Sequence, residues 1–182
     1  GILEAGGLPV AFPVISLGED LMKASSMLYR NLLSIEIEEN LRSYPLDGVV
    51  LLANCDKSVP GALMGAFSAN LPTIMVTAGA RPAPFFKGKK VGTGTDLWRA
   101  LEDWRAGRMS DEEWREFEEC LSCGLGSCNT MGTASSVALM TEMLGFMLPG
   151  TGTIPAGTDE RREAARASGR RIVEMVRADL TP

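Results

Sequence analysis

The stretch "GVVLLANCDKSVPGALMGAFSANLPTIMVTAG" (48–79) contains two short apolar runs separated by a helix-like segment. Residues 48–54 and 71–79 carry no charge and are rich in aliphatic side chains, as expected of strands buried on both faces. Pro60 suits the first turn of a helix, which is expected to run to about Asn70. This order predicts two neighbouring parallel strands, and therefore an α/β fold in which a parallel sheet is flanked by helices.

The rest of the sequence predicts one further strand and several helices. Prolines interrupt the apolar run 8–16, which suits an edge or entering strand. Residues 80–95 are rich in Gly, Pro and Lys and predict a loop. The segment 132–150 is small and apolar on nearly every side, so its helix is expected to be buried. Helices are expected at 25–44, 96–107, 110–121, 132–150 and 158–180.

Two of these helices carry specific local patterns. In the first, Leu28, Leu32 and Ile35 recur at helical spacing, with charged residues between them. Ser110 and Glu113 are spaced as a capping box, which predicts a helix start at this position.

Composition excludes several classes of function. The 182 residues carry 18 Lys and Arg against 23 Asp and Glu, a net charge of -5, which argues against a nucleic-acid surface. No apolar run approaches the roughly 20 residues that span a bilayer, and the first residues do not resemble a signal peptide. We therefore expect a cytoplasmic protein without a membrane partner, in which the four cysteines serve as metal ligands, catalytic groups or core rather than as disulfides. The absence of histidine removes histidine bases and histidine zinc sites.

The tripeptide Cys55, Asp56, Lys57 follows the first predicted strand directly. Ligands of open α/β sheets gather outside the carboxyl ends of the strands, which makes these three side chains candidates for a binding site. The alternative is that the three residues have no binding role: Cys55 is then a small buried side chain, Asp56 a turn or cap residue and Lys57 a solvated lysine.

Three further cysteines occur together as C-x2-C-x4-C: Cys120, Cys123 and Cys128. They are candidates for a metal site of their own, and a closed zinc site would need a fourth ligand such as Cys55. Alternatively, only some of these three cysteines bind a metal. Cys128 lies in a glycine-rich turn before a helix, where backbone N–H groups stabilise charge on sulfur.

Two long motifs, "NCDKSVPGALM" (54–64) and "GSCNTMGTASSVALMTEMLGFMLPG" (126–150), resemble the dihydroxy-acid and sugar-acid dehydratase family. The similarity extends over essentially the whole chain. Two segments, residues 92–123 and "MLYRNLLSIEIEE" (27–39), are more similar to the sugar-acid branch, of arabinonate or xylonate type, than to the branched-chain amino-acid branch. The resemblance implies that residues 1–182 are part of the N-terminal domain of a larger two-domain dehydratase.

The resemblance also implies roles for five residues. Cys55 and Cys128 match cysteines that hold an iron–sulfur cluster, with [2Fe–2S] favoured over [4Fe–4S]. Glu19, Asp56 and Lys57 match Mg²⁺ ligands, the lysine after carbamylation. Soft thiolates suit iron, whereas carboxylate and carbamate oxygens suit the hard Mg²⁺.

The implied reaction removes water from a 2,3-dihydroxy sugar acid to give a 2-keto-3-deoxy acid. In the family that the sequence resembles, the base serine belongs to a later domain and a third cluster cysteine is expected before the region that corresponds to residue 1. The resemblance therefore implies no catalytic base here, and the piece alone is expected to be inactive. The expected partner is a small sugar acid, and a homo-oligomer is expected at full length. The alternatives are a branched-chain dihydroxy-acid dehydratase and a non-catalytic cysteine-based metal-binding module.

Overall fold

Two parallel strands form the centre of the molecule. β1 (Val49–Leu52) pairs with β2 (Thr73–Val76), and Val49 lies opposite Thr73. α2 (Ser58–Ala69) connects the strands and has Pro60 in its first turn. The predicted parallel pair and its connecting helix are therefore confirmed.

Helices account for most of the remaining regular structure. The structure, a computed structural model, describes residues 1–17, 25–122 and 124–182. None of the helices in these ranges is long and apolar enough to cross a membrane. They are a short 3-10 helix (Ser26–Leu28), α1 (Tyr29–Ser43), α2, α3 (Thr95–Arg105), α4 (Asp111–Ser122), α5 (Thr133–Met143) and α6 (Asp159–Arg177).

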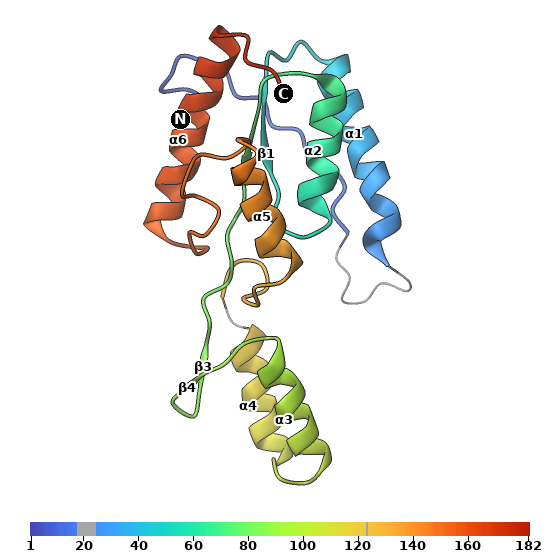
Figure 1. Cartoon of the computed structure of the whole chain (residues 1–182), viewed down its shortest axis with the longest axis vertical. Helices are drawn as coiled ribbons and strands as arrows, with labels where there is room; N and C mark the ends of the chain where they lie inside the picture. Colours follow the sequence, from blue (N-terminus) through green and yellow to red (C-terminus); the bar gives the residue numbers. More distant parts are fainter. Residues whose placement is uncertain (18–24, 123) are drawn as a thin grey trace.

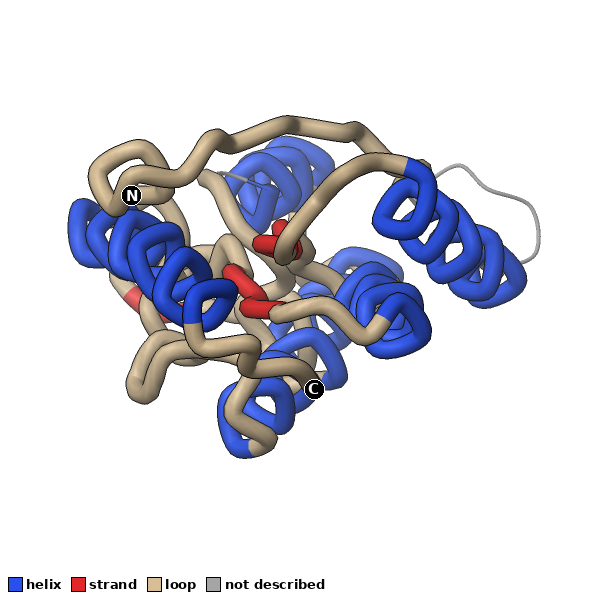
Figure 2. The backbone as a smooth tube through the Cα atoms, turned by 90° about the horizontal axis from the view of Figure 1, so that it is seen from above, coloured by secondary structure: helices blue, strands red, loops and turns tan. Residues whose placement is uncertain are grey.

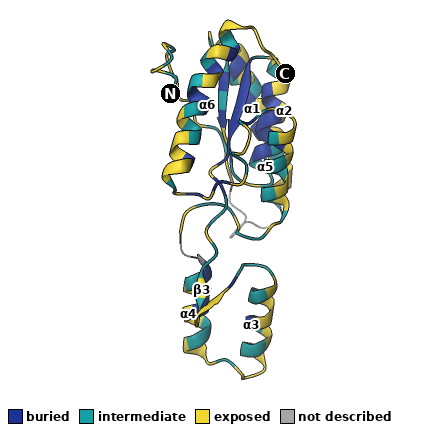
Figure 3. Ribbon diagram, turned by 60° about the vertical axis from the view of Figure 1, so that its left-hand side comes forward, coloured by how far each residue is buried: buried dark blue, intermediate teal, exposed yellow. Residues whose placement is uncertain are grey.

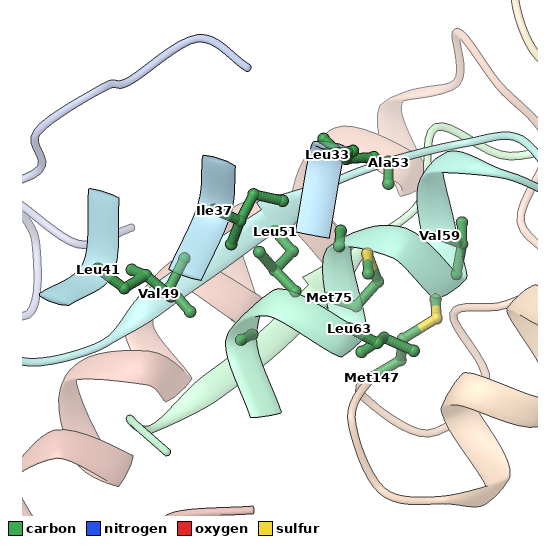
Figure 4. Packing of buried hydrophobic residues seen from close by; sticks show 12 residues of the cluster. Leu33, Ile37, Leu41, Val49, Leu51, Ala53, Val59, Leu63, Met75 and Met147 are labelled. Carbon is green, nitrogen blue, oxygen red and sulfur yellow. The ribbon is translucent and has the colours of Figure 1, made fainter. Parts of the chain in front are cut away.

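Helices cover both faces of the strand pair, with α1 and α2 on one face and α6 on the other (Figures 1 and 2). Successive side chains of a strand point to opposite faces. Val49 and Leu51 accordingly pack with Ile37 in the cluster shown in Figure 4, whereas Val50 and Ile74 pack toward α6. The burial pattern in Figure 3 follows this layering, with the strands dark and the outer helix faces exposed.

The contact between α1 and α2 depends on a glycine. A Cβ atom at Gly65 would lie 2.5 Å from the carbonyl oxygen of Ser34 and 2.9 Å from Cβ of Ile37. Real Cβ atoms do not approach a backbone oxygen so closely, so only glycine permits this distance between the helices. The largest hydrophobic cluster lies directly beneath this contact.

The α3–α4 hairpin extends from the body of the molecule (Figure 1). Its helices are held together by Trp104 and Trp114, whose rings stack with centroids 5.2 Å apart. The predicted capping box is confirmed, because Ser110 N–H donates to Glu113 Oε2 (3.0 Å) and Glu113 N–H donates to Ser110 Oγ (3.2 Å).

The segment 80–95, predicted as a loop, contains a small antiparallel hairpin. β3 (Phe85–Phe86) pairs with β4 (Lys89–Lys90) across Lys87 and Gly88, which both have positive φ angles, 47° and 76°. This tight two-residue turn matches the twist of antiparallel strands. The sequence prediction missed the hairpin because Lys is not a usual residue for the first turn position.

Two predictions about the apolar segments are wrong. Residues 8–16 form no strand; Leu8 is 85% exposed, and the prolines in this run cannot donate ladder hydrogen bonds. α5 is not a buried helix, because only Ala138 and Thr141 are buried on it while Met143 is 85% exposed. The helix also ends at Met143, before the predicted stop at 149–150.

We expect Gly65→Ala in the full-length protein to lower the free energy of unfolding by about 1–3 kcal/mol, since the added methyl forces α1 and α2 apart. Alanine's higher helix propensity opposes this loss by about 1 kcal/mol. Urea unfolding followed by circular dichroism measures the difference. Ser68→Ala, on the exposed side of the same helix, is the control. Equal urea midpoints for Gly65→Ala and Ser68→Ala would contradict the close contact between α1 and α2 at Gly65.

Candidate cofactor and metal site

The carboxyl ends of the two strands are joined to the Cys128 loop through Gly79. Asn54 Oδ1 accepts a hydrogen bond from Gly79 N–H at 3.1 Å, and Gly79 O accepts one from Ser127 N–H at 3.0 Å. Asn54 directly precedes Cys55, and Ser127 directly precedes Cys128. Two hydrogen bonds therefore link the backbone segments that carry the two predicted cluster cysteines.

Cys55 lies in the turn between β1 and α2. Its thiol donates to Ser58 Oγ at 3.1 Å, and its sulfur accepts a hydrogen bond from Ser58 N–H at 3.2 Å. Ser58 Oγ also accepts from Cys55 N–H at 3.1 Å, so this serine holds both the backbone and the side chain of the cysteine. The sulfur is exposed and not in a disulfide.

Asp56 and Lys57 are brought together next to this cysteine. Lys57 Nζ lies 3.8 Å from Asp56 Oδ1, and the lysine side chain is only 16% exposed. Arg30 Nη2 donates to Asp56 O at 3.2 Å, which anchors the turn to α1. Lys57 and Cys55 both line a cavity of about 20 Å³ beside Arg30. Glu19, the third predicted Mg²⁺ ligand, lies outside the described residues.

Cys128 is surrounded by hydroxyl groups. Thr93 Oγ1 lies 2.8 Å from Cys128 Sγ, and Thr130 N–H donates to the sulfur at 3.4 Å. Burial raises the pKa of this thiol, but the hydrogen bonds of Thr130 and Thr93 and the positive charge of Arg81 lower it, and the net pKa lies below the ordinary value. A thiol with a lowered pKa supplies the anionic sulfur that binds metals.

Cys120 has a different environment. It lies on α4, its thiol donates to Phe85 O at 3.3 Å, and it packs against the buried Phe117 and Leu121 of the α3–α4 hairpin. Its sulfur is therefore engaged in packing. Cys123 lies outside the described residues.

The donor chemistry of these side chains fits both predicted groups. Cys55 and Cys128 offer free, exposed sulfurs with N–H and hydroxyl donors around them, as cluster ligands require. Asp56 offers oxygen, and Lys57 offers oxygen only as a carbamate. Within 1–17, 25–122 and 124–182, no three Cys, Asp or Glu side chains form a ready-made metal cage. The described residues thus offer donor atoms for part of each predicted ligand set.

A second cavity, of about 210 Å³, lies between the strand ends and α5. None of the described residues that line it is charged. Its polar side chains are amides and hydroxyls: Asn54, Thr77, Ser127, Asn129, Ser135 and Thr153. Three of these are sequence neighbours of Cys55 or Cys128, so the cavity lies next to the candidate cluster ligands.

Three residues of this site escaped prediction from the sequence. Ser58, Arg30 and Thr93 hold the candidate ligands through specific hydrogen bonds. Ser58, three residues after Cys55 at a predicted helix start, was the most accessible to sequence reasoning. Arg30 and Thr93 are 26 and 35 residues from their partners, and no local spacing connects them.

Comparison with known proteins gives related dehydratases over the entire chain. Full coverage of residues 1–182 is found with L-arabinonate dehydratase of Rhizobium leguminosarum at 47% identity and with 6-deoxy-6-sulfo-D-gluconate dehydratase of Pseudomonas putida at 44%. Dihydroxy-acid dehydratase of Clostridium botulinum is 37% identical. The chain spans 31% of the length of the first two relatives and 34% of the third. The model of the family "Dihydroxy-acid/6-phosphogluconate dehydratase N-terminal" matches residues 1–182, and the chain belongs to this family.

Proposed function

We propose that the full-length protein is a hydro-lyase that removes water from a 2,3-dihydroxy sugar acid, with an iron–sulfur cluster of [2Fe–2S] type and Mg²⁺ as cofactors. The observation that carries the proposal is the double hydrogen-bond link through Gly79, which brings the Cys55 and Cys128 segments to one edge of the sheet. Cytoplasmic location and homo-oligomeric assembly complete the proposal.

In this proposal Cys55 and Cys128 hold the cluster, while Asp56 and carbamylated Lys57 hold Mg²⁺ together with Glu19. When bound, the two centres supply Lewis acidity toward the hydroxyl and carboxylate oxygens of the substrate. Ser58 orients the Cys55 sulfur through its backbone N–H, which donates to Sγ at 3.2 Å, and Thr93 orients the Cys128 sulfur through its hydroxyl, 2.8 Å away.

The position of Lys57 beside Asp56 supports the carbamate. Lys57 Nζ lies 3.8 Å from Asp56 Oδ1, so a carbamate formed on this amine would place its oxygens next to the carboxylate. The ammonium first loses a proton; the neutral amine then forms a C–N bond with CO₂ and loses a second proton, which leaves a carbamate anion with two oxygen donors. These oxygens then lie beside the Asp56 carboxylate, in the ligand chemistry that Mg²⁺ prefers.

The neutral cavity beside the cysteines supports a sugar acid as substrate. Its amides and hydroxyls suit the hydroxyl groups of a sugar chain, and they lie beside apolar side chains such as Met131 and Leu139 that suit its carbon backbone. A site built to bind substrate hydroxyls discriminates strongly against analogues that lack them.

The substrate class is tested with purified full-length protein, measuring 2-keto acid formation from a panel of aldonic acids and from 2,3-dihydroxy-3-methylbutanoate. We expect kcat/KM to be at least about 100-fold higher for the preferred aldonic acid, since unpaired polar groups penalise the apolar analogue. The opposite order would assign the protein to the branched-chain branch.

Iron binding is tested by Cys128→Ser and Cys120→Ser in the full-length protein. Cys128→Ser should lose most of its iron and its dehydratase activity, because a cluster ligand is removed. Cys120→Ser should keep both, because its sulfur packs within the hairpin. Iron and sulfide analysis with visible absorption measures the result. Iron retained in Cys128→Ser and in Cys55→Ala, but lost in Cys120→Ser, would instead support the cysteine-based metal-binding module.

The magnesium site is tested by Lys57→Met, with Lys90→Met as the control on exposed β4. Lys57→Met should abolish the carbamate signal in ¹³C NMR after labelling with ¹³C-bicarbonate, and activity should no longer respond to Mg²⁺. Lys90→Met should match the unmodified protein in both measurements. A carbamate signal that survives Lys57→Met would place the modification on another lysine.

A further inference from the structure

The segment "VGTGT" (91–95) lies against Cys128, although 35 residues separate Thr93 from this cysteine. Thr93 Oγ1 lies 2.8 Å from Cys128 Sγ, 3.0 Å from Asn129 Oδ1 and 3.0 Å from Thr130 Oγ1. Thr93 N–H donates to Asn129 Oδ1 at 3.1 Å. The backbone N–H and the hydroxyl group of Thr93 therefore both face residues 128–130.

The α3–α4 hairpin fixes Thr93 in this place. Gly92 N–H donates to the Asp96 carboxylate at 2.9 Å, in the first turn of α3, and Val91 is buried in the hydrophobic cluster of the hairpin. A Cβ atom at Gly94 would lie 3.4 Å from Thr130 Oγ1, an ordinary van der Waals distance, so the backbone of the segment lies directly beside Thr130. Both sequence neighbours of Thr93 are thus fixed, Gly92 by its bond to Asp96 and Gly94 by its position beside Thr130.

The Thr93 hydroxyl has one proton and three neighbouring acceptors. Asn129 Oδ1 accepts from both the Thr93 N–H and the Thr93 hydroxyl, and Thr130 Oγ1 has a proton of its own to donate. A metal-bound cysteine sulfur can only accept, and charge-assisted hydrogen bonds are about twice as strong as neutral ones. The Thr93 proton is therefore directed to Cys128 Sγ when this sulfur is a cluster ligand.

We propose that Thr93 is a positioning residue of the cluster, whose hydroxyl donates a hydrogen bond to the Cys128 sulfur and thereby raises the reduction potential and strengthens iron retention. The inference rests on the proposed function, because it takes Cys128 as a ligand. Hydrogen bonds to cluster sulfurs are among the factors that set reduction potentials, and they do so by withdrawing electron density from the sulfur. Loss of such an outer hydrogen bond typically weakens metal binding about 10–100-fold.

The test uses the full-length protein with its cluster and three variants. Thr93→Val removes the hydroxyl at nearly constant volume, Thr93→Ser retains it, and Thr95→Val changes an exposed threonine of the same segment. The midpoint potential is measured by redox titration, and iron retention by the rate of iron release to a chelator. We expect Thr93→Val to have a lower potential and about tenfold faster iron release, while the other two variants match the unmodified protein.

The possible results separate this inference from the proposed function. If Thr93→Val keeps the unmodified potential and release rate while Cys128→Ser loses its iron, the role of Thr93 is wrong and the cluster assignment stands. If Cys128→Ser keeps its iron, the ligand assignment itself fails. If Thr93→Val does not fold, Thr93→Ala makes the same comparison, since it also lacks the hydroxyl.

Discussion

The arrangement of the candidate site depends on the close backbone contacts around Gly79. Its N–H and carbonyl groups bond the segments that carry Cys55 and Cys128, and its φ angle of +89° favours glycine. A Cβ atom here would lie 2.2 Å from Ile154 O, so any other residue would displace the 151–157 segment. One glycine at the end of β2 therefore sets the spacing of three separate parts of the chain. The Cys55 segment is held through the Asn54 side chain and the Cys128 segment through a backbone hydrogen bond, and both bonds are made by the backbone of Gly79.

α6 also supports the candidate site, from the face of the strand pair opposite to α1 and α2. Arg161, buried on α6, donates through Nη2 to the carbonyls of Thr151 and Ile154, and so holds the segment that packs against Gly79. Burial lowers the pKa of Arg161, and its Nε and Nη1 atoms have no hydrogen-bond partner among the described residues. An incompletely paired guanidinium is costly in the interior, and the two carbonyl bonds offset part of this cost. The amphipathic α6 thus supports the site without contributing a ligand.

The sequence predicts the centre of the fold well because β1 and β2 carry no charge and because one helix fits between them. It does not predict which side of α1 is buried. Leu28, Leu32 and Ile35 recur at helical spacing but are exposed, whereas Leu33, Ile37 and Leu41 are buried, also at helical spacing. Two apolar stripes on one helix satisfy the same periodicity, and the choice between them is made by the close contact at Gly65, which is a tertiary effect. In the candidate site, Cys55 and Asp56 could be predicted because they directly follow a predicted strand. Thr93 and Arg30 could not, because they reach the site only when segments distant in sequence fold against it.

The turn at residues 55–57 explains how adjacent side chains supply two different kinds of ligand. Ser58 holds Cys55 by three hydrogen bonds at the start of α2, while Arg30 holds the carbonyl of Asp56 from α1. The turn is therefore clamped at both ends by different helices, and its three side chains have separate surroundings. Cys55 is exposed as a free sulfur, whereas Lys57 is largely buried beside Asp56. Soft and hard donors lie one residue apart in sequence, yet their surroundings differ, because Ser58 and Arg30 hold the backbone between them.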